Sequence, residues 1–241
     1  MVIAVDLGTT YAKLGFFKGN ELVKVRQGVT LSQLGDYIND QGVERVIISS
    51  VSYNHEQLKN IMERPEKAVF LTNKLSLPIK TDYETPETLG ADRLAAAAGA
   101  YNLFPGMDCL IIDAGTCITV DLLDKTGTFC GGSISPGINL KFKALHNYTT
   151  NLPLVITEDV VELPGKSTKG SILAGVVLGT QAEIREIVRL YRNKFPILQL
   201  VICGGDAEQV KKGLNSDVAV VPELVLWGLK TILDYHVKKE N

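Results

Sequence analysis

The chain has 241 residues, of which 45% are hydrophobic and 22% are charged, with a formal net charge of −2 and a pI near 6.0. At this length and composition we expect one large or two small folded domains that need no disulfide or metal to hold a core. No dense block of Lys and Arg indicates a nucleic-acid surface. The sequence shows neither the pattern of a signal peptide nor the apolar run of ~20 residues that a membrane-spanning helix needs. We therefore expect a cytoplasmic protein without a membrane partner.

The first half of the sequence alternates apolar runs with turn signals in the order strand, strand, strand, helix, strand, helix, strand. The first three strands form a meander, and Lys18-Gly-Asn20 is typical of the turn between the second and the third. The predicted ranges are 1–7, 11–17, 21–27, 31–40, 46–48, 54–63 and 68–71. An Ala-rich helix is then predicted to open near Glu87 and to continue through Asn102.

The second half repeats the meander and the alternation that follows it. Its predicted strands and helices cover 110–112, 116–123, 128–134, 182–194, 198–202, 218–221 and a final helix from Pro222 to about 237. The repetition predicts an α/β duplication with an N-terminal half, 1–106, and a C-terminal half, 107–241. Each half is expected to hold a mixed sheet, and the two sheets are expected to flank a central cleft.

One short motif occurs in both halves, each time after a strand. Asp6-Leu-Gly-Thr9 and Asp113-Ala-Gly-Thr116 align at one constant offset. Glycine lets a ligand approach the main chain, and amides that point out of such a turn can bind an anion. A hairpin turn without function also uses Asp and Gly. The copy favours phosphate binding, because packing alone does not require the same acid, glycine and hydroxyl twice.

The stretch from Glu87 to Arg93 places an acid and a base at the start of the Ala-rich helix. Neighbouring residues on a helix do not face each other, so Asp92 and Arg93 are not expected to pair. Asp92 can accept a proton from an attacking hydroxyl, while Arg93 can hold an anionic group. The alternative is an acid in a first helical turn beside a surface arginine.

A third glycine turn, Cys203-Gly-Gly-Asp206, ends a buried strand. The chain's glycine turns resemble those of the acetate kinase, sugar kinase, Hsp70 and actin superfamily, and the resemblance implies that this turn packs against the adenosine. The alternative is a plain strand-to-helix connection with Asp206 near the helix start.

The cysteines and histidines have no spacing that indicates a metal site. The four cysteines, Cys109, Cys117, Cys130 and Cys203, form no C-x-x-C pair and are expected to be small buried side chains.

Five motifs occur in one order: Asp6-x-Gly, Gly90-Ala-Asp-Arg93, Asp113-x-Gly-Thr116, Gly131-Gly-Ser-Ile-Ser-Pro-Gly137 and Gly165-Lys-Ser-Thr168. The set resembles the type III pantothenate kinases over the whole chain. The duplicated turn resembles those of the acetate kinase, sugar kinase, Hsp70 and actin superfamily. The resemblance implies duplicated ribonuclease H-like (actin-like) domains and ATP-dependent phosphorylation of pantothenate, the first step of coenzyme A synthesis. It also implies a homodimer that uses Mg²⁺ and a monovalent cation, K⁺ or NH₄⁺.

The same resemblance implies roles for individual residues. The residues implied in ATP binding are Asp6, Leu7, Gly8, Thr9, Thr10, Lys13 and Thr116. Those implied in pantothenate binding are Tyr83, Gly90, Ala91, Asp92, Arg93 and Thr168, with Asp92 as the catalytic proton acceptor. Asp113 is implied as the ligand of the monovalent cation. The segment 131–137 is implied to line the cleft, and the alternative is a loop between a strand and a helix.

One position departs from the family pattern, because the first turn of the family usually reads Asp-x-Gly-Asn and this chain has Thr9. A hydroxyl differs from a carboxamide in donor count and geometry, which bears on the nucleotide contact but not on the fold. Two alternative functions stay open at this point. One is another small-molecule kinase or ATPase of the superfamily, and the other is a non-catalytic nucleotide-binding regulator.

Overall fold

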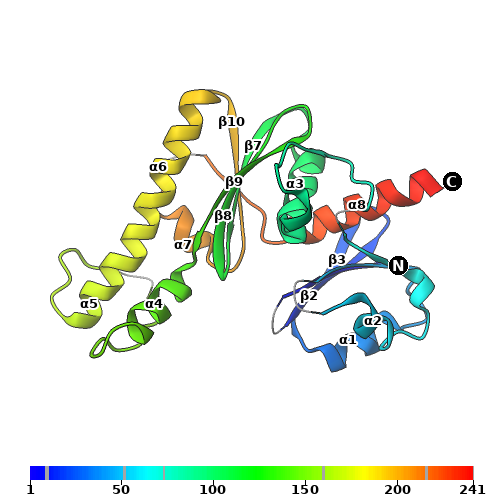
Figure 1. Cartoon of the computed structure of the whole chain (residues 1–241), viewed down its shortest axis with the longest axis horizontal. Helices are drawn as coiled ribbons and strands as arrows, with labels where there is room; N and C mark the ends of the chain where they lie inside the picture. Colours follow the sequence, from blue (N-terminus) through cyan, green and yellow to red (C-terminus); the bar gives the residue numbers. More distant parts are fainter. Residues whose placement is uncertain (9–10, 51–52, 73, 159–160, 215–216, 241) are drawn as a thin grey trace. The chain divides into compact units, whose positions relative to one another are not determined.

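The computed structural model describes residues 1–8, 11–50, 53–72, 74–158, 161–214 and 217–240 (Figure 1). The chain forms two compact units. The first unit comprises Met1–Gly106, Thr126–Cys130 and Glu223–Asn241, and the second comprises Met107–Lys125 and Gly131–Pro222. Within the described residues, no helix is both long enough and apolar enough to cross a membrane.

The first unit contains a mixed sheet of five strands in the order β3-β2-β1-β4-β5. The strands are β1 (Val2–Leu7), β2 (Ala12–Lys18), β3 (Glu21–Val29), β4 (Arg45–Ser50) and β5 (Ala68–Phe70). β1 pairs antiparallel with β2 and parallel with β4, as a meander followed by a helical crossover requires. In the sequence, the helix α1 (Leu31–Ile38) lies between β3 and β4, and the helix α2 (His55–Lys59) lies between β4 and β5.

Alternate residues of β1 face opposite sides of this sheet. Ile3, Val5 and Leu7 pack in one cluster with Leu34 of α1 and Leu58 of α2. The final helix α8 (Leu224–Glu240) contacts β1, β2 and β4, and its Trp227 meets Phe17 of β2 edge-on at 5.2 Å. Both faces are therefore covered by helices, which explains the apolar run Val46, Ile47 and Ile48 at the centre of β4.

The helix α3 (Ala91–Leu103) packs closely against α8 in the first unit. A Cβ added to Gly228 would lie 1.6 Å from the carbonyl oxygen of Ala95, and one added to Gly99 would lie 2.4 Å from that of Leu224. The two glycines let the backbones approach each other, so this contact excludes any larger residue at either position.

The second unit holds most of a six-stranded mixed sheet in the order β11-β10-β7-β8-β9-β6. Its strands are β7 (Asp108–Ala114), β8 (Cys117–Leu123), β9 (Thr128–Pro136), β10 (Leu198–Cys203) and β11 (Ala219–Val220). The sixth strand, β6 (Lys80–Thr81), belongs to the first unit and pairs with the start of β9. The helices are α4 (Ile138–Asn147), α5 (Thr168–Leu173), the π-helical η3 (Ala174–Leu178), α6 (Gly179–Lys194) and α7 (Ala207–Lys211). The helices α6 and α7 pack on the sheet, and a separate cluster joins α4, α5 and η3.

The predicted duplication is confirmed, because the strand order 9-8-7-10-11 repeats the order 3-2-1-4-5. The prediction for α2 was too long, since Asn60 ends the helix five residues before Pro65. The final helix begins at Leu224 rather than at Pro222. The cysteine prediction is right for Cys109 and Cys203 and wrong for Cys117 and Cys130, which are exposed. Burial, with the nearby Asp108 carboxylate, raises the pKa of the Cys109 thiol to about 12.

Candidate active site

The first glycine turn follows β1 in the first unit. Gly8 N donates a hydrogen bond to Tyr11 O at 3.2 Å, which closes the turn between β1 and β2. Asp6 and Leu7 are the last residues of β1, and Asp6 lies directly opposite Lys13 of β2. Directly opposed residues share a face of the sheet, so the register places a cation beside this carboxylate. Thr9 and Thr10 lie outside the described residues.

The second glycine turn has the same start but is one residue shorter. Gly115 N donates to Cys117 O at 3.0 Å, and the register places Thr119 opposite Asp113. The two aspartates therefore differ in their cross-strand neighbours, because Thr119 carries no charge where Lys13 carries one. The two motifs therefore align at one constant offset in the sequence, but the strands that follow the two turns pair in registers that differ by one residue.

The second and third glycine turns meet in the second unit. Asp206 N donates to Ala114 O at 2.9 Å, and a Cβ on Gly204 would lie 2.5 Å from Asp113 Oδ1. Gly204 has φ +90°, so both its conformation and its surroundings require glycine. Burial raises the pKa of the Asp206 carboxyl. The second and third glycine turns therefore lie next to each other.

A pocket of about 530 Å³ opens beside these two turns. Its lining residues are Ala114, Gly115, Thr116, Asn139, Leu140, Lys143, Gly205 and Asp206. A Cβ added to Gly205 would meet nothing within 4 Å, so the backbone there is open to a ligand. Sequence reasoning missed Asn139 and Lys143, which lie two and six residues after the glycine segment 131–137.

The segment 131–137 is mostly strand, since β9 extends to Pro136, and its glycines permit close packing. A Cβ on Gly132 would lie 2.0 Å from Val120 O, and one on Gly137 would lie 2.2 Å from Gly115 O. Gly137 N also donates to Thr116 O at 3.0 Å. The segment therefore packs against the backbone of the second turn. It leads directly into α4, which lines the pocket.

A polar cluster ties α4 to α6 next to this segment. Lys141 Nζ donates to Glu183 Oε2 at 2.6 Å and to Thr180 Oγ1 at 3.0 Å. Burial raises the pKa of Glu183, but the hydrogen bonds from Lys141 and Ser135 and the charge of Lys141 together outweigh it and hold that pKa below its usual value. The cluster thus fixes the end of β9 and the two helices relative to one another.

Gly90 is the N-cap of α3, and Asp92 lies in the first turn of that helix. Asp92 Oδ1 accepts a hydrogen bond from Arg93 N at 2.9 Å, and a Cβ on Gly90 would lie 2.5 Å from the same oxygen. The alternative interpretation of Asp92, an acid at a helix start, therefore describes its position correctly. It is wrong for Arg93, which is buried with 6% of its surface exposed.

Arg93 packs against two aromatic rings of the first unit that also contact each other. Its guanidinium carbon is 5.6 Å from the centroid of Tyr83 and 5.5 Å from that of Phe129. The two rings contact each other edge-on at 6.0 Å. Cation–π contacts of this kind hold the guanidinium plane in place. Phe129 was not predicted as a site residue, because a buried Phe in a strand has the same pattern as any core residue.

The remaining predicted residues lie in the second unit. Thr168 is the first residue of α5, whose N-cap Ser167 accepts from Gly170 N at 3.0 Å. A Cβ on Gly165 would lie 2.5 Å from Ser171 N, so the Gly165-Lys-Ser-Thr168 motif forms a compact helix entry. No group of three His, Cys, Asp or Glu side chains that could hold a metal occurs among the residues that the structure describes.

Comparison with protein families and known proteins gives one consistent result. The family model "Type III pantothenate kinase" matches residues 2–190. Proteins of that name from Cytophaga hutchinsonii and Bacteroides fragilis are 42% and 38% identical to this chain; each alignment covers 98% of this chain, and 100% and 98% of the respective relative. A third, from Flavobacterium johnsoniae, is 33% identical over the whole of both chains.

Solved structures match at the level of the fold. A conserved Baf family protein from Campylobacter jejuni, proposed to be a transcriptional activator, has a TM-score of 0.66 at 21% identity and covers 98% of this chain and 99% of its own. The activator of the 2-hydroxyisocaproyl-CoA dehydratase from Clostridium difficile has a TM-score of 0.56 at 13% identity, covering 100% of this chain and 97% of its own. The expected actin-like fold is confirmed.

Proposed function

The chain belongs to the type III pantothenate kinase family and catalyses the ATP-dependent phosphorylation of pantothenate in coenzyme A synthesis, and we propose that Asp92 and Arg93 carry the acceptor side of this reaction. The observation that supports this assignment is the start of α3, where Asp92 lies in the first turn and Arg93 is buried against Tyr83 and Phe129. A helix start that only faced solvent would not need its arginine to be buried against two aromatic rings.

In the proposed mechanism, Asp92 accepts the proton of the pantothenate hydroxyl as that oxygen attacks the γ-phosphorus of ATP; the bond from this phosphorus to the β,γ-bridging oxygen breaks, and ADP leaves with its electron pair. Its bond from Arg93 N holds the carboxylate at the helix start. Arg93 binds the pantothenate carboxylate, since its planar fork can donate to two oxygens at once. Gly90, Ala91, Tyr83 and Thr168 are proposed to complete the pantothenate contacts.

We propose nucleotide contacts in each of the two units, one set at each glycine turn. Asp6, Leu7, Gly8 and Lys13 are proposed nucleotide contacts in the first unit, together with Thr9 and Thr10, which the structure does not describe. Thr116 is the proposed contact in the second unit, where the open backbone at Gly205 and the Lys143 ammonium suit an anionic nucleotide. The pocket of about 530 Å³ has the size of a small-ligand site.

The chemistry of the donors fits two cations. Mg²⁺ is commonly held by one or two carboxylates and the substrate phosphates, so it needs no cluster of three acids. Asp6 is the proposed carboxylate, and Mg²⁺ when bound offsets phosphate charge. Asp113 is proposed to hold K⁺ or NH₄⁺. The register supports this difference, because Asp6 is opposite Lys13 whereas Asp113 is opposite the uncharged Thr119.

A homodimer is the proposed assembly. The apolar residues of the final helix do not support it, because Leu224, Leu226, Leu229 and Ile232 are fully buried within the chain. Support comes instead from exposed apolar side chains on the segments around α4 and α5 of the second unit: Ile134, Tyr148, Leu154, Ile156 and Leu163. Large exposed apolar groups of this kind are typical of interfaces when they cluster.

The experiment that tests the function measures ADP release with and without pantothenate at saturating ATP and Mg²⁺. Pantothenate-dependent ADP release is expected. Turnover that depends on another hydroxyl compound would favour a different small-molecule kinase, and nucleotide binding without turnover would favour the regulator.

A further inference from the structure

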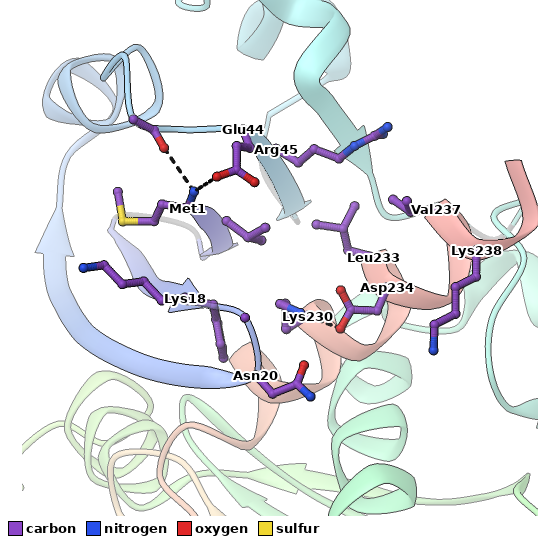
Figure 2. Close-up of a pocket in the computed structure, with 14 residues that line it drawn as sticks. Met1, Lys18, Asn20, Glu44, Arg45, Lys230, Leu233, Asp234, Val237 and Lys238 are labelled. Carbon is purple, nitrogen blue, oxygen red and sulfur yellow. Dashed lines mark hydrogen bonds and ion pairs between the residues drawn. The ribbon is translucent and has the colours of Figure 1, made fainter. Parts of the chain in front are cut away.

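A second, larger pocket lies in the first unit at the opposite end of β1 from the glycine turn (Figure 2). Its volume is about 1020 Å³, and none of the proposed substrate-binding residues lines it. It is bordered by the start of β1, the hairpin after β2, the loop before β4 and the second half of α8. At a rise of about 3.3 Å per residue, Val2 at this pocket and Asp6 at the turn are about 13 Å apart.

The floor of this pocket is apolar and its rim is mostly basic. Val2, Phe17, Leu233 and Val237 supply the apolar part. Four basic side chains line it, Lys18, Arg45, Lys230 and Lys238, against two carboxylates, Glu44 and Asp234. Both carboxylates already bind cationic groups, because Glu44 bonds the α-amino group of Met1 and Asp234 bonds Lys230. The excess charge of the rim is therefore positive.

Lys230 is the most unusual of these residues. Only 6% of its surface is exposed, and Lys230 Nζ donates to Asp234 Oδ2 at 2.5 Å. An ammonium has three donors, and Asp234 is its only partner among the residues that the structure describes. A buried charge with unused donors is unfavourable unless an acceptor enters the pocket. This geometry selects a ligand that brings anionic oxygen to Lys230.

The spacing of the lysines indicates how long that ligand is. Lys230 and Lys238 are eight residues apart on α8, about 12 Å along the helix axis. Figure 2 shows Lys18 on the opposite side of the opening from Lys238. Neither Lys18 nor Lys238 has a partner within the described part of the chain. At this spacing an elongated molecule with a phosphate at each end matches the three ammonium groups better than a single phosphate does.

We propose that this pocket binds an elongated organic bisphosphate, held by the buried Lys230 and by the exposed Lys18 and Lys238. The organic centre of the ligand would pack on Phe17 and Leu233. The site lies apart from Asp6 and from Gly90–Arg93, so its ligand binds without displacing either substrate. The proposal does not depend on which hydroxyl compound the enzyme phosphorylates.

The only tryptophan of the chain can report this binding. Trp227 contacts Phe17, which lines the pocket. The probe is fructose 1,6-bisphosphate, which is transparent where tryptophan absorbs, and the reference ligand is inorganic phosphate. We expect a saturable change in Trp227 emission, with the bisphosphate bound at least about tenfold more tightly than phosphate and more weakly at high salt.

Two variants with opposite expected effects test the assignment. Lys18→Gln/Lys238→Gln removes two exposed charges and should raise the Kd at least about tenfold. Asp234→Asn removes the anion that competes for Lys230 and should lower the Kd by about threefold to tenfold. It should also increase the rise in Tm that the ligand produces. The matched control, Lys125→Gln/Lys194→Gln, removes two exposed lysines of the second unit and should bind like the wild type.

Pantothenate-dependent ADP release is measured on the same proteins and should be unchanged in the Lys18→Gln/Lys238→Gln enzyme. This separates the pocket from the active site, so that failure of one proposal is not read as failure of the other. The proposal is overturned if the wild type shows no saturable signal, if phosphate binds as tightly as the bisphosphate, or if the Lys18→Gln/Lys238→Gln signal equals that of the wild type.

Discussion

Arg93 has the most closely defined environment of the proposed site residues. Two aromatic rings pack against its guanidinium, and the helix that carries it begins two residues earlier at Ala91. Tyr83 was expected from the family resemblance, whereas Phe129 comes from a strand that begins 35 residues after Arg93. A side chain that reaches a site only through strand pairing leaves no local signal in the sequence.

The Phe129→Leu variant tests this role of the ring. Each cation–π contact contributes about 0.5–2 kcal/mol, so we expect the KM for pantothenate to rise by roughly 2- to 30-fold with a smaller change in kcat. Steady-state kinetics at saturating ATP measure both. The control is Phe70→Leu, which removes a ring that faces Lys59 at 6.0 Å on the edge strand β5. An equal rise in KM for both variants would contradict a specific role of Phe129.

Asp113 differs from Asp6 in its cross-strand neighbour, and this difference leads to a cation prediction. Wild-type turnover should be fast in K⁺ or NH₄⁺ and slow in Na⁺ at matched ionic strength. The Asp113→Asn enzyme should be slow in all three, because a carboxamide cannot replace the charge. Equal wild-type rates in K⁺ and Na⁺ would leave Asp113 as a residue that only shapes its turn.

At the scale of elements, the contact between α3 and α8 matters most for the site. The start of α3 carries Asp92 and Arg93, and its middle lies against α8 through Gly99 and Gly228. Any side chain at Gly228 would overlap the carbonyl oxygen of Ala95, so the helices would have to separate.

We therefore expect Gly228→Ala to lower the free energy of unfolding by about 1–3 kcal/mol or more, measured by urea denaturation. It should also raise the KM for pantothenate, because α3 would shift. The matched control is Gly179→Ala on α6, where an added Cβ meets nothing within 4 Å. That change should be neutral or stabilising by up to about 1 kcal/mol, because alanine favours helix more than glycine does. A Gly228→Ala protein as stable as the control would show that the helices do not need this close approach.

Much of the element order could be predicted, because short apolar strands and turn residues alternate in both halves. The one-residue difference in length between the two glycine turns could not be predicted, because both turns contain the same motif, Asp-x-Gly-Thr. The turns differ only in the residue at which the second strand of each hairpin begins to pair with the first. Likewise, nothing in the apolar pattern of α8 indicates which sheet it covers. Asn139 and Lys143 were missed because Ile138, Leu140 and Phe142 alternate with polar residues at the start of α4, which is not the spacing of a helix.

At the scale of the whole molecule, the assembly remains a prediction. Light scattering at assay concentration should give twice the mass of the 26.2 kDa chain. Ile156→Asp places a charge among the exposed apolar residues around α4 and α5, and should shift the mass toward the monomer. Val23→Asp on β3, which is also exposed, is the control and should leave the mass unchanged. A monomeric wild type with full activity would contradict the proposed dimer.

The most direct test of the proposed function measures the product that Asp92 helps to form. Wild type and Asp92→Asn are incubated with ATP, Mg²⁺ and pantothenate, and phosphopantothenate is quantified by mass spectrometry, while pantothenate binding is measured separately by calorimetry. We expect the wild type to form phosphopantothenate and the variant to form it roughly 10²- to 10⁴-fold more slowly, with little change in pantothenate affinity. An Asp92→Asn enzyme that forms phosphopantothenate at a near-normal rate would contradict the assignment of Asp92 as the base.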